Sequence, residues 1–247
     1  MIRYKIVIEY DGLRFCGWQF QNNQKTVQGT LQNVLEKIVG TFCLVEGCGR
    51  TDTGVHAKGQ VAHFDLPRFW EPYKLVEAMN AYLRFEGVCV VQAERVENHF
   101  HARFSCLGRA YEYLILNRQA PSPLLCNFAW HVRKPLNVQA MQEAALHFLG
   151  THDFSAFRAS ECQAHNPCKT ISHFSVNQDD NMIRLYVASR SFLHNQVRIM
   201  VGTLKLVGQG KLEPRDVTRI LETKDRTEAG PTAPAYGLYF MKAIYDS

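Results

Sequence analysis

The hydrophobic period of the chain changes within its first forty residues, and this change constrains the fold more than any other feature. Large apolar side chains first alternate with other residues: Tyr4, Ile6, Ile8 and Tyr10. This period of two predicts a strand that turns at Asp11-Gly12. Residues 27–39 then carry apolar side chains at the i, i+3, i+4 spacing, which predicts an amphipathic helix ending at Gly40.

The rest of the sequence continues this mixture. Apolar segments predict strands at 42–48, 60–66, 88–96, 109–116, 170–177, 182–190 and 237–245. Helical spacing predicts helices at 72–83, 138–148 and 193–206 and a shorter one from Pro214. Residues 117–136 hold three prolines and little periodicity, which is typical of a linker. We therefore predict an α/β fold of two similar mixed lobes, residues 1–105 and 106–247.

Composition excludes several classes of protein. Of the 247 residues, 46% are hydrophobic and 21% are charged, as in a folded globular chain. No apolar run approaches the roughly 20 residues of a membrane span, and the first ten residues lack the hydrophobic block of a secretory signal. Eight cysteines without a regular spacing indicate reduced thiols. We therefore expect a cytoplasmic protein that does not contact membranes.

Positive charge is concentrated in one segment. The whole chain has a net charge of +5, and residues 181–220, with seven basic and two acidic residues, account for the same excess. The basic residues are Arg184, Arg190, Arg198, Lys205, Lys211, Arg215 and Arg219. Such a segment favours a polyanionic partner such as nucleic acid. A solvated helix face is the alternative interpretation.

The segment 49–57 is the strongest candidate for catalytic chemistry. It places Asp52 between two threonines, with glycines at 49 and 54 and Arg50 two residues earlier. Residues i and i+2 of an extended segment share a face, so we expect Arg50 beside the Asp52 carboxylate, where it favours the ionised form. An ionised carboxylate on a glycine-bordered loop suits attack on a sugar carbon. An ordinary Asp-Thr-Gly turn between strands is the alternative.

Asp-Thr-Gly also occurs in aspartic proteases. Those enzymes need two carboxylates that share one proton. The chain contains one Asp-Thr-Gly, and Arg50 favours full ionisation of Asp52. The sequence therefore disfavours a protease.

A second loop offers possible zinc ligands. Cys162, His165 and Cys168 are spaced by three residues, as zinc ligands can be. The possible sources of a fourth ligand are Cys43, Cys48 and His173. Because no second paired motif is present, we favour a loop with buried thiols and predict no metal site. Three other histidines are interpreted as structural or RNA-facing: His56, His99 and His101.

The predicted helix 193–206 has a cationic flank. At about 100° per residue, His194, Arg198 and Lys205 lie roughly a quarter turn from the centre of its apolar face. A cation at the rim of a packed face reaches a neighbouring cleft while its stem remains packed. Arg198 is therefore a candidate partner for a carboxylate or a phosphate, with a surface arginine as the alternative.

Taken together, these segments resemble a known family. Residues 49–57, Gly-Arg-Thr-Asp-Thr-Gly-Val-His-Ala, resemble the G-R-T-D-x-G-V-H signature of the tRNA pseudouridine synthase A (TruA) family. Further segments are similar in the same order along the chain: 10–19, 101–105, 109–113, 153–158, 192–198 and 229–239. The resemblance covers nearly the whole chain, and the ordered set is more specific than the nonapeptide alone.

The resemblance implies a fold, a function and a partner. The implied fold is two similar α/β lobes that share a central mixed, largely antiparallel sheet. The implied function is isomerisation of uridine to pseudouridine at positions 38, 39 and 40 of the tRNA anticodon stem-loop, by a homodimer whose basic cleft crosses the interface. This reaction oxidises nothing and takes no group from outside, so we expect no cofactor.

The resemblance also implies roles for residues. Asp52 acts at the ribose as a nucleophile or as a base, and Arg50 and Arg198 hold it charged and contact the flipped nucleotide. Tyr111 packs on the uracil and is a candidate for removing the C5 proton. Further candidates for RNA contacts are Lys58, Arg103 and Arg158.

Two functions from other classes are the alternatives. A non-catalytic RNA-binding protein would keep the basic surface without needing Asp52. A metal-dependent hydrolase built on residues 162–168 would lose activity on chelation.

Overall fold

The computed structural model of the chain describes residues 1–162 and 164–246. The chain forms two compact units, the first made of residues 1–107 with the C-terminal residues from Tyr239, and the second of residues 108–238. The predicted boundary at 105/106 lies two residues from this division. The prediction also placed the C-terminal strand in the second lobe, whereas that strand pairs with a strand of the first unit.

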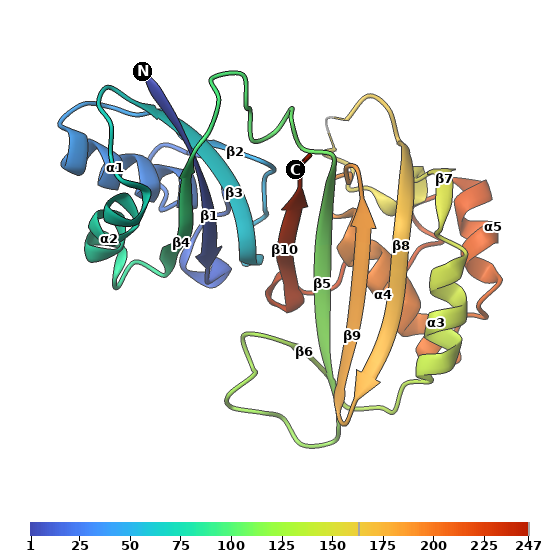
Figure 1. Ribbon diagram of the computed structural model, residues 1–247. Helices are drawn as coiled ribbons and strands as arrows, with labels where there is room; N and C mark the ends of the chain where they lie inside the picture. Colours follow the sequence, from blue (N-terminus) through green and yellow to red (C-terminus); the bar gives the residue numbers. More distant parts are fainter. Residues whose placement is uncertain (163, 247) are drawn as a thin grey trace. The chain divides into compact units, whose positions relative to one another are not determined.

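The first unit is built on a mixed, largely antiparallel sheet (Figure 1). Its strands are β1 (Ile2–Tyr10), β2 (Glu46–Gly47), β3 (His56–Leu66), β4 (Val88–Arg95) and β10 (Leu238–Ile244). The order is β4-β1-β3-β10, with β2 paired along β3. β1 pairs antiparallel with β3 and β4, whereas β10 pairs in parallel with β3, Tyr239 opposite His56. The C-terminal strand thus lies beside the residues that follow the Asp52 loop.

Two helices pack with this sheet, α1 (Val27–Val39) and α2 (Pro72–Leu83) (Figure 1). α1 begins where the Thr26 hydroxyl accepts the Gly29 N–H at 3.2 Å, and it ends at Gly40 with φ of 83°. The Asn80 side chain bonds both backbone groups of Val90 at 2.8 Å and so joins α2 to β4. Both helices cover the predicted residues, because their start and stop signals are local.

The opposite side of β1 is charged and is covered by residues 97–105. Arg3 pairs with Asp65 at 2.7 Å and donates to the Phe100 carbonyl at 2.8 Å. The Lys5 ammonium lies 5.5 Å from the centre of the Phe100 ring and 5.4 Å from that of Tyr245. The segment between the two units is therefore fixed on the first unit before the chain enters the second.

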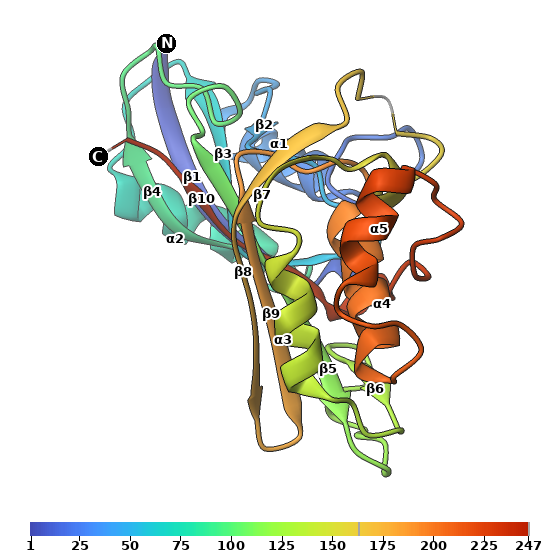
Figure 2. The ribbon, with the colours of Figure 1, turned by 90° about the vertical axis from the view of Figure 1, so that its right-hand side faces the viewer.

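The second unit has the strand order β5-β9-β8-β7, with β6 paired in parallel with β5. Its strands are β5 (Gly108–Asn117), β6 (Trp130–Val132), β7 (Gly150–Asp153), β8 (Cys168–Asp179) and β9 (Met182–Ser189). Figure 2 shows α3 (Val138–Leu146), α4 (Gln196–Gly208) and α5 (Asp216–Thr223) on one side of this sheet. Four rings pack together beneath these helices: Phe148, Phe154, Phe157 and Phe174. Helices and largely antiparallel strands in both units confirm the predicted α/β class.

The chain also forms short 3-10 helices at η1 (Gly12–Arg14), η2 (Ser155–Phe157) and η3 (Ala235–Gly237). β6 lies inside the segment 117–136, which the sequence predicted to be a linker. The Asn117 side chain donates to the carbonyls of Val132 and Lys134 at 2.8 Å and so ties this segment to β5. α4 begins at Gln196 rather than 193, because Asn195 has φ of 61°. No helix in the described ranges is long and apolar enough to span a membrane.

Candidate active site

Asp52 lies on the loop between β2 and β3. The Val55 N–H donates to the Asp52 carbonyl at 3.1 Å, which closes a turn over residues 52–55. Gly54 has φ of 82° in this turn, a conformation that favours glycine. Asp52 itself is half-buried. The Asp-Thr-Gly sequence therefore forms a tight turn with the aspartate at its first position.

One side of this turn packs on Gly12. The Gly54 N–H donates to the Gly12 carbonyl at 3.3 Å. A Cβ atom added to Gly12 would lie 2.1 Å from the Val55 carbonyl oxygen, so that a larger residue displaces the turn. Gly12 opens a 3-10 helix that Asp11 caps, its side chain accepting the Leu13 N–H at 3.1 Å. The Asp52 turn is thus held against a second rigid turn.

The other side of the loop is held at Thr51. The Tyr10 and Thr51 hydroxyls lie 2.8 Å apart, and the Trp18 N–H donates to the Thr51 carbonyl at 3.0 Å. Gly17, with φ of 83°, approaches so closely that an added Cβ would lie 2.8 Å from the same carbonyl. Burial raises the pKa of Tyr10 to about 12, so its hydroxyl stays protonated near neutral pH. The backbone on both sides of Asp52 is fixed.

His56 follows the loop and is buried, as the structural interpretation expects. Its Nδ1 accepts the Gly12 N–H at 3.1 Å. The Asp11 carboxylate lies 3.3 Å from the same nitrogen, but the Gly12 N–H can only donate, so we assign Nδ1 as the acceptor. The ring stacks on Tyr239 with centres 4.8 Å apart. His56 therefore connects the loop to η1 and β10.

Arg50 lies two residues before Asp52, directly ahead of the turn. It is exposed, and in the described part of the chain it forms no ion pair with Asp52. Its placement beside the carboxylate stays a prediction.

Three predicted RNA contacts lie at accessible positions. The exposed Lys58 ammonium lies 5.2 Å from the centre of the Tyr239 ring. The exposed Arg103 guanidinium lies 5.8 Å from the centre of the Phe104 ring. Arg158 is half-buried and follows the 3-10 helix at 155–157.

Tyr111 lies on β5 in the second unit. It is opposite Val187 of β9, and its ring meets Phe192 edge to face with centres 5.2 Å apart. The residue is buried, with 9% of its surface exposed. Phe192 therefore limits the orientation of the Tyr111 ring.

Arg198 lies in the first turn of α4. Its Nε donates to the Ala233 carbonyl and its Nη1 to the Asn195 side chain, both at 2.7 Å. The Ala233 N–H in turn donates to the Arg198 carbonyl at 3.1 Å. These bonds leave the guanidinium little freedom. Arg198 is thus a positioned cation and not a mobile surface arginine.

The segment 229–234 that holds Arg198 is itself fixed. Arg226 donates to the Gly230 carbonyl at 3.0 Å, and the Gly230 N–H donates to the Thr203 hydroxyl at 2.8 Å. α4 approaches this segment at Gly202, where an added Cβ would lie 1.7 Å from the Pro231 carbonyl oxygen. Glycine is therefore needed in the helix at this point, and helix and segment form one rigid support.

Acidic neighbours neutralise part of the basic segment 181–220. Arg184 lies 3.4 Å from Glu112, and Arg215 lies 2.7 Å from Glu213. Arg219 pairs with Asp216 at 3.2 Å and with Glu228 at 2.6 Å. Arg190 and Lys211 are exposed and form no ion pair within the described ranges. These two are therefore the better candidates for phosphate contacts.

The cysteine-histidine loop does not form a metal site in the described residues. Cys162 is half-buried and Cys168 is exposed at the start of β8, so the expectation of buried thiols is wrong. Neither cysteine belongs to a cluster of three possible ligands among residues 1–162 and 164–246.

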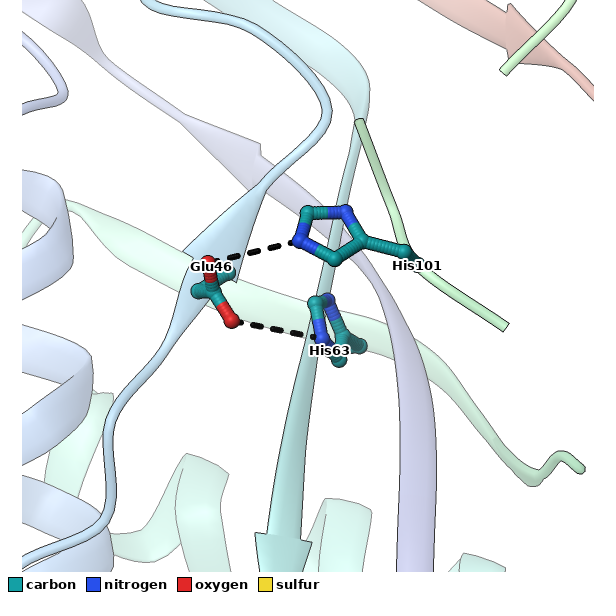
Figure 3. Close-up of side chains that lie close together, drawn as sticks. All are labelled: Glu46, His63 and His101. Carbon is teal, nitrogen blue, oxygen red and sulfur yellow. Dashed lines mark ion pairs between the residues drawn. The ribbon is translucent and has the colours of Figure 1, made fainter. Parts of the chain in front are cut away.

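A different cluster does bring three possible ligands together. Glu46 of β2, His63 of β3 and His101 converge in Figure 3, with ligand atoms within 4.8 Å of one another. The Nε2 atoms of His63 and His101 lie 3.5 and 3.4 Å from the two Glu46 oxygens. The sequence analysis did not group these residues, because they are far apart in the chain.

Hydrogen bonds on the other ring nitrogens decide what this cluster does. His63 Nδ1 accepts the Ala102 N–H at 3.3 Å, and His101 Nδ1 accepts the Arg103 N–H at 3.1 Å. A neutral imidazole that accepts at Nδ1 carries its proton on Nε2. A metal at Nε2 would need the reverse, a proton on Nδ1 facing an acceptor. The two rings therefore present N–H groups to Glu46, and the cluster is unsuited to hold a metal in this arrangement.

The first mixed α/β unit carries an aspartate fixed through its backbone, and the second carries an arginine fixed by hydrogen bonds and a tyrosine packed against a phenylalanine ring. The family of tRNA pseudouridine synthases matches residues 6–105 and 144–246. These ranges contain Asp52 and Arg198, while Tyr111 lies between them. The chain belongs to the tRNA pseudouridine synthase family, whose members are isomerases, and the predicted enzyme class is confirmed.

Relatives support this assignment over the full chain. The chain is 51% identical to tRNA pseudouridine synthase A of Paramagnetospirillum magneticum, over 100% of this chain and 96% of the relative. It is 48% identical to the protein of that name from Rhodospirillum rubrum, over 99% and 88%, and 46% identical to that from Allorhizobium ampelinum, over 99% and 95%. One solved structure, titled "Crystal Structure of a Cbf5-Nop10-Gar1 Complex", aligns with a TM-score of 0.34 and 12% identity, over 96% of this chain and 58% of that chain. That similarity is too distant to support an argument.

Proposed function

We propose that the chain isomerises uridine to pseudouridine at positions 38, 39 and 40 of the tRNA anticodon stem-loop, as a cytoplasmic homodimer. The observation that supports this most is the Asp52 turn. It is held on one side by Gly12 and on the other by the Thr51 contacts. A carboxylate placed this rigidly suits a reaction that needs charge at one fixed point of the ribose.

The reaction rearranges bonds within one nucleotide. The N1–C1′ bond breaks, the uracil turns over, a C5–C1′ bond forms, C5 loses its proton and N1 gains one, so substrate and product have the same composition. Asp52 acts at the ribose as a nucleophile or as a base. Because nothing is oxidised and no group is donated from outside, the residues themselves have to supply the catalysis.

The other site residues bind and orient the nucleotide. The target base has to leave the stem, which costs a few kcal/mol. We assign to Tyr111 the face of the flipped uracil and a part in removing the C5 proton. Arg198 and Arg50 contact the nucleotide, and the fixed guanidinium of Arg198 stabilises negative charge without reorganising. Lys58, Arg103 and Arg158 contact the surrounding RNA.

Homodimer formation completes the proposal. A stem-loop is larger than the surface of one loop, and a second copy would extend the basic residues Arg190 and Lys211 along the RNA. Sedimentation velocity on the free protein tests this part by itself.

Tritium release from tRNA labelled at C5 of uridine tests the activity. We expect release from transcripts with uridine at positions 38, 39 or 40 and none from a transcript with cytidine at all three. Release should be unchanged by a chelator. Equal release from both transcripts would overturn the proposed positions, and loss of release on chelation would favour the metal-dependent alternative.

A further inference from the structure

The turn His101–Ser105 is fixed on the first unit at its centre. Ala102 is fully buried, its N–H donates to His63 Nδ1 at 3.3 Å, and its carbonyl accepts the Tyr245 hydroxyl at 2.7 Å. Within the turn, the Ser105 N–H donates to the His101 carbonyl and the His101 N–H to the Ser105 hydroxyl, both at 2.9 Å. The backbone of this turn is therefore as well bonded as a secondary-structure element.

His101 orients the two residues that face solvent. Its Nδ1 accepts the N–H of Arg103 at 3.1 Å and that of Phe104 at 3.4 Å. Its Nε2 lies 3.4 Å from Glu46, which also faces His63. The cluster in Figure 3 thus fixes the ring that caps the turn.

Phe104 is exposed in spite of this order. Its exposed fraction is 77%, among the highest of the large apolar side chains in the described residues. The Phe104 ring is tilted by 41° against the His101 ring, with centres 4.3 Å apart, and the Arg103 guanidinium lies 5.8 Å from the Phe104 ring centre. A single exposed apolar ring needs no explanation by itself, but this ring is held outward by a bonded turn and has a cation beside it, and the two features together suit a ligand that offers both a ring and a negative charge.

We propose that Phe104 is a stacking platform for an unpaired nucleobase of the RNA substrate, a binding subsite that rests on the proposed function. An aromatic face beside a guanidinium is the combination that binds single-stranded nucleic acid, because every base offers a face to stack and a phosphate to pair. A second protein would more often meet such a ring with apolar surroundings, whereas here its neighbours are an imidazole and a cation.

The position of the turn relative to Asp52 agrees with this assignment. Glu46 lies opposite His63 in the β2–β3 pairing, and the Gln60 side chain bonds the Gly49 carbonyl three residues further along. At about 3.3 Å per residue, this separation is roughly 10 Å. The Asp52 turn follows directly. The platform turn contacts Glu46 and His63 of the β2–β3 pair, and the loop between these two strands carries Asp52, so one RNA can contact both.

Phe85 provides a matched control. It is 79% exposed, and the Arg84 guanidinium lies 5.3 Å from its ring. Phe85 follows α2, and its backbone N–H donates to no side chain in the described residues. The Phe104 N–H, in contrast, donates to His101 Nδ1. Phe85→Ala thus removes an equally exposed aromatic ring beside an arginine, but from the end of α2 and not from the turn His101–Ser105.

The test is binding of a fluorescein-labelled tRNA transcript with uridine at positions 38–40, followed by anisotropy. We expect Phe104→Ala to weaken binding about 5-fold or more, since stacking is worth roughly 1–3 kcal/mol per base, and Phe104→Trp to bind within twofold of the unchanged protein. Phe85→Ala should bind normally. The dependence of affinity on salt should not change in Phe104→Ala, because stacking releases no counterions. Circular dichroism melts check that the variants fold.

The outcomes separate this inference from the proposed function. Binding of Phe104→Ala equal to that of the unchanged protein overturns the platform while tritium release by the unchanged protein still supports the activity. A shift of Phe104→Ala from dimer to monomer with unchanged affinity per chain makes the ring a subunit contact and also overturns it. Absence of tritium release by the unchanged protein counts against the proposed function alone.

Discussion

The two units position their charged site residues by different means. In the first unit, Asp52 is placed through the backbone: Gly12 and Gly17 approach the loop so closely that neither position has room for a Cβ atom. In the second, Arg198 is placed through its side chain, which donates to Ala233 and Asn195. The aspartate side chain is short, so the position of its carboxylate depends on the position of its backbone. The arginine side chain is long, and the hydrogen bonds of its guanidinium fix its position.

This difference determines which substitutions matter. The Asp52 loop should be sensitive to glycines that never touch the substrate. The placement of Arg198 should be sensitive to the loss of single hydrogen bonds.

Asp52→Asn should abolish turnover while tRNA affinity stays within a few-fold. The change keeps the size of the side chain and removes only its negative charge. Tritium release measures the activity, and anisotropy measures the affinity. Activity at a tenth of the unchanged protein or more would show that Asp52 is not the essential residue.

Gly12→Ala should lower kcat by about 100-fold, since displacement of a site residue by about 1 Å can cost this much. Crowding in both Gly12→Ala and Gly202→Ala should lower the free energy of unfolding by about 1–3 kcal/mol. Gly40→Ala is the control, because a Cβ there meets no atom within 4 Å. It should cost about 1–2 kcal/mol through its left-handed backbone alone and leave kcat unchanged. Equal kcat values for Gly12→Ala and Gly40→Ala would refute placement of Asp52 through the backbone.

Arg198→Lys keeps the charge and removes the planar set of donors that bonds Ala233 and Asn195. We expect kcat to fall by about tenfold or more while affinity for tRNA changes little, because a lysine ammonium is not fixed in one plane. Steady-state and binding measurements separate the two. If the variant lost affinity and kept kcat, Arg198 would be a phosphate contact only.

Tyr111→Phe separates two roles of one ring. If the ring packs on the uracil and the hydroxyl moves a proton, the variant should bind tRNA normally and stall after cleavage of the N1–C1′ bond. Single-turnover analysis of the products measures this. Full activity in Tyr111→Phe combined with loss in Tyr111→Ala would leave the packing role alone.

The smallest effects should come from the basic segment. Lys211→Glu or Arg190→Glu should flatten the slope of log affinity against log salt by roughly one unit, the contribution of about one phosphate. Arg219→Glu should change the slope less, since Asp216 and Glu228 already hold this guanidinium. An unchanged slope in all three variants would mean that the segment is a solvated face and that the RNA lies elsewhere.

Local signals explain which parts of the fold could be predicted. α1 and α2 were predicted to the residue, because the cap at Thr26, the stop at Gly40 and Pro72 act within one turn. β6 was missed, because a strand of three residues exists only through its partner β5. β7 was missed for the same reason, since it is defined by its pairing with β8.

The candidate site shows the same limit. Asp52 was found from its glycine-bordered loop, and Arg198 from the flank of a helix. The supports were not found, because Gly12 looked like an ordinary turn residue and its contact with Val55 crosses more than forty positions of sequence. Gly12 and Gly17 are only five residues apart, and two glycines so close together were the one signal in the sequence that could have indicated close backbone approach.

The pairing of β10 with β3 has a consequence for folding during synthesis. Tyr239 stacks on His56 beside the Asp52 loop. The ribosome adds more than 130 residues between Leu107, where the first segment of the first unit ends, and Tyr239, where its second segment begins. At roughly 5–20 residues per second, a ribosome needs about 7 to 26 s for that interval. During this time the β3 edge that later pairs with β10 has no partner strand in the nascent first unit, and the His56 ring is not yet covered by Tyr239. The site therefore matures late, and a chaperone that shields this edge would act on the nascent chain in that interval.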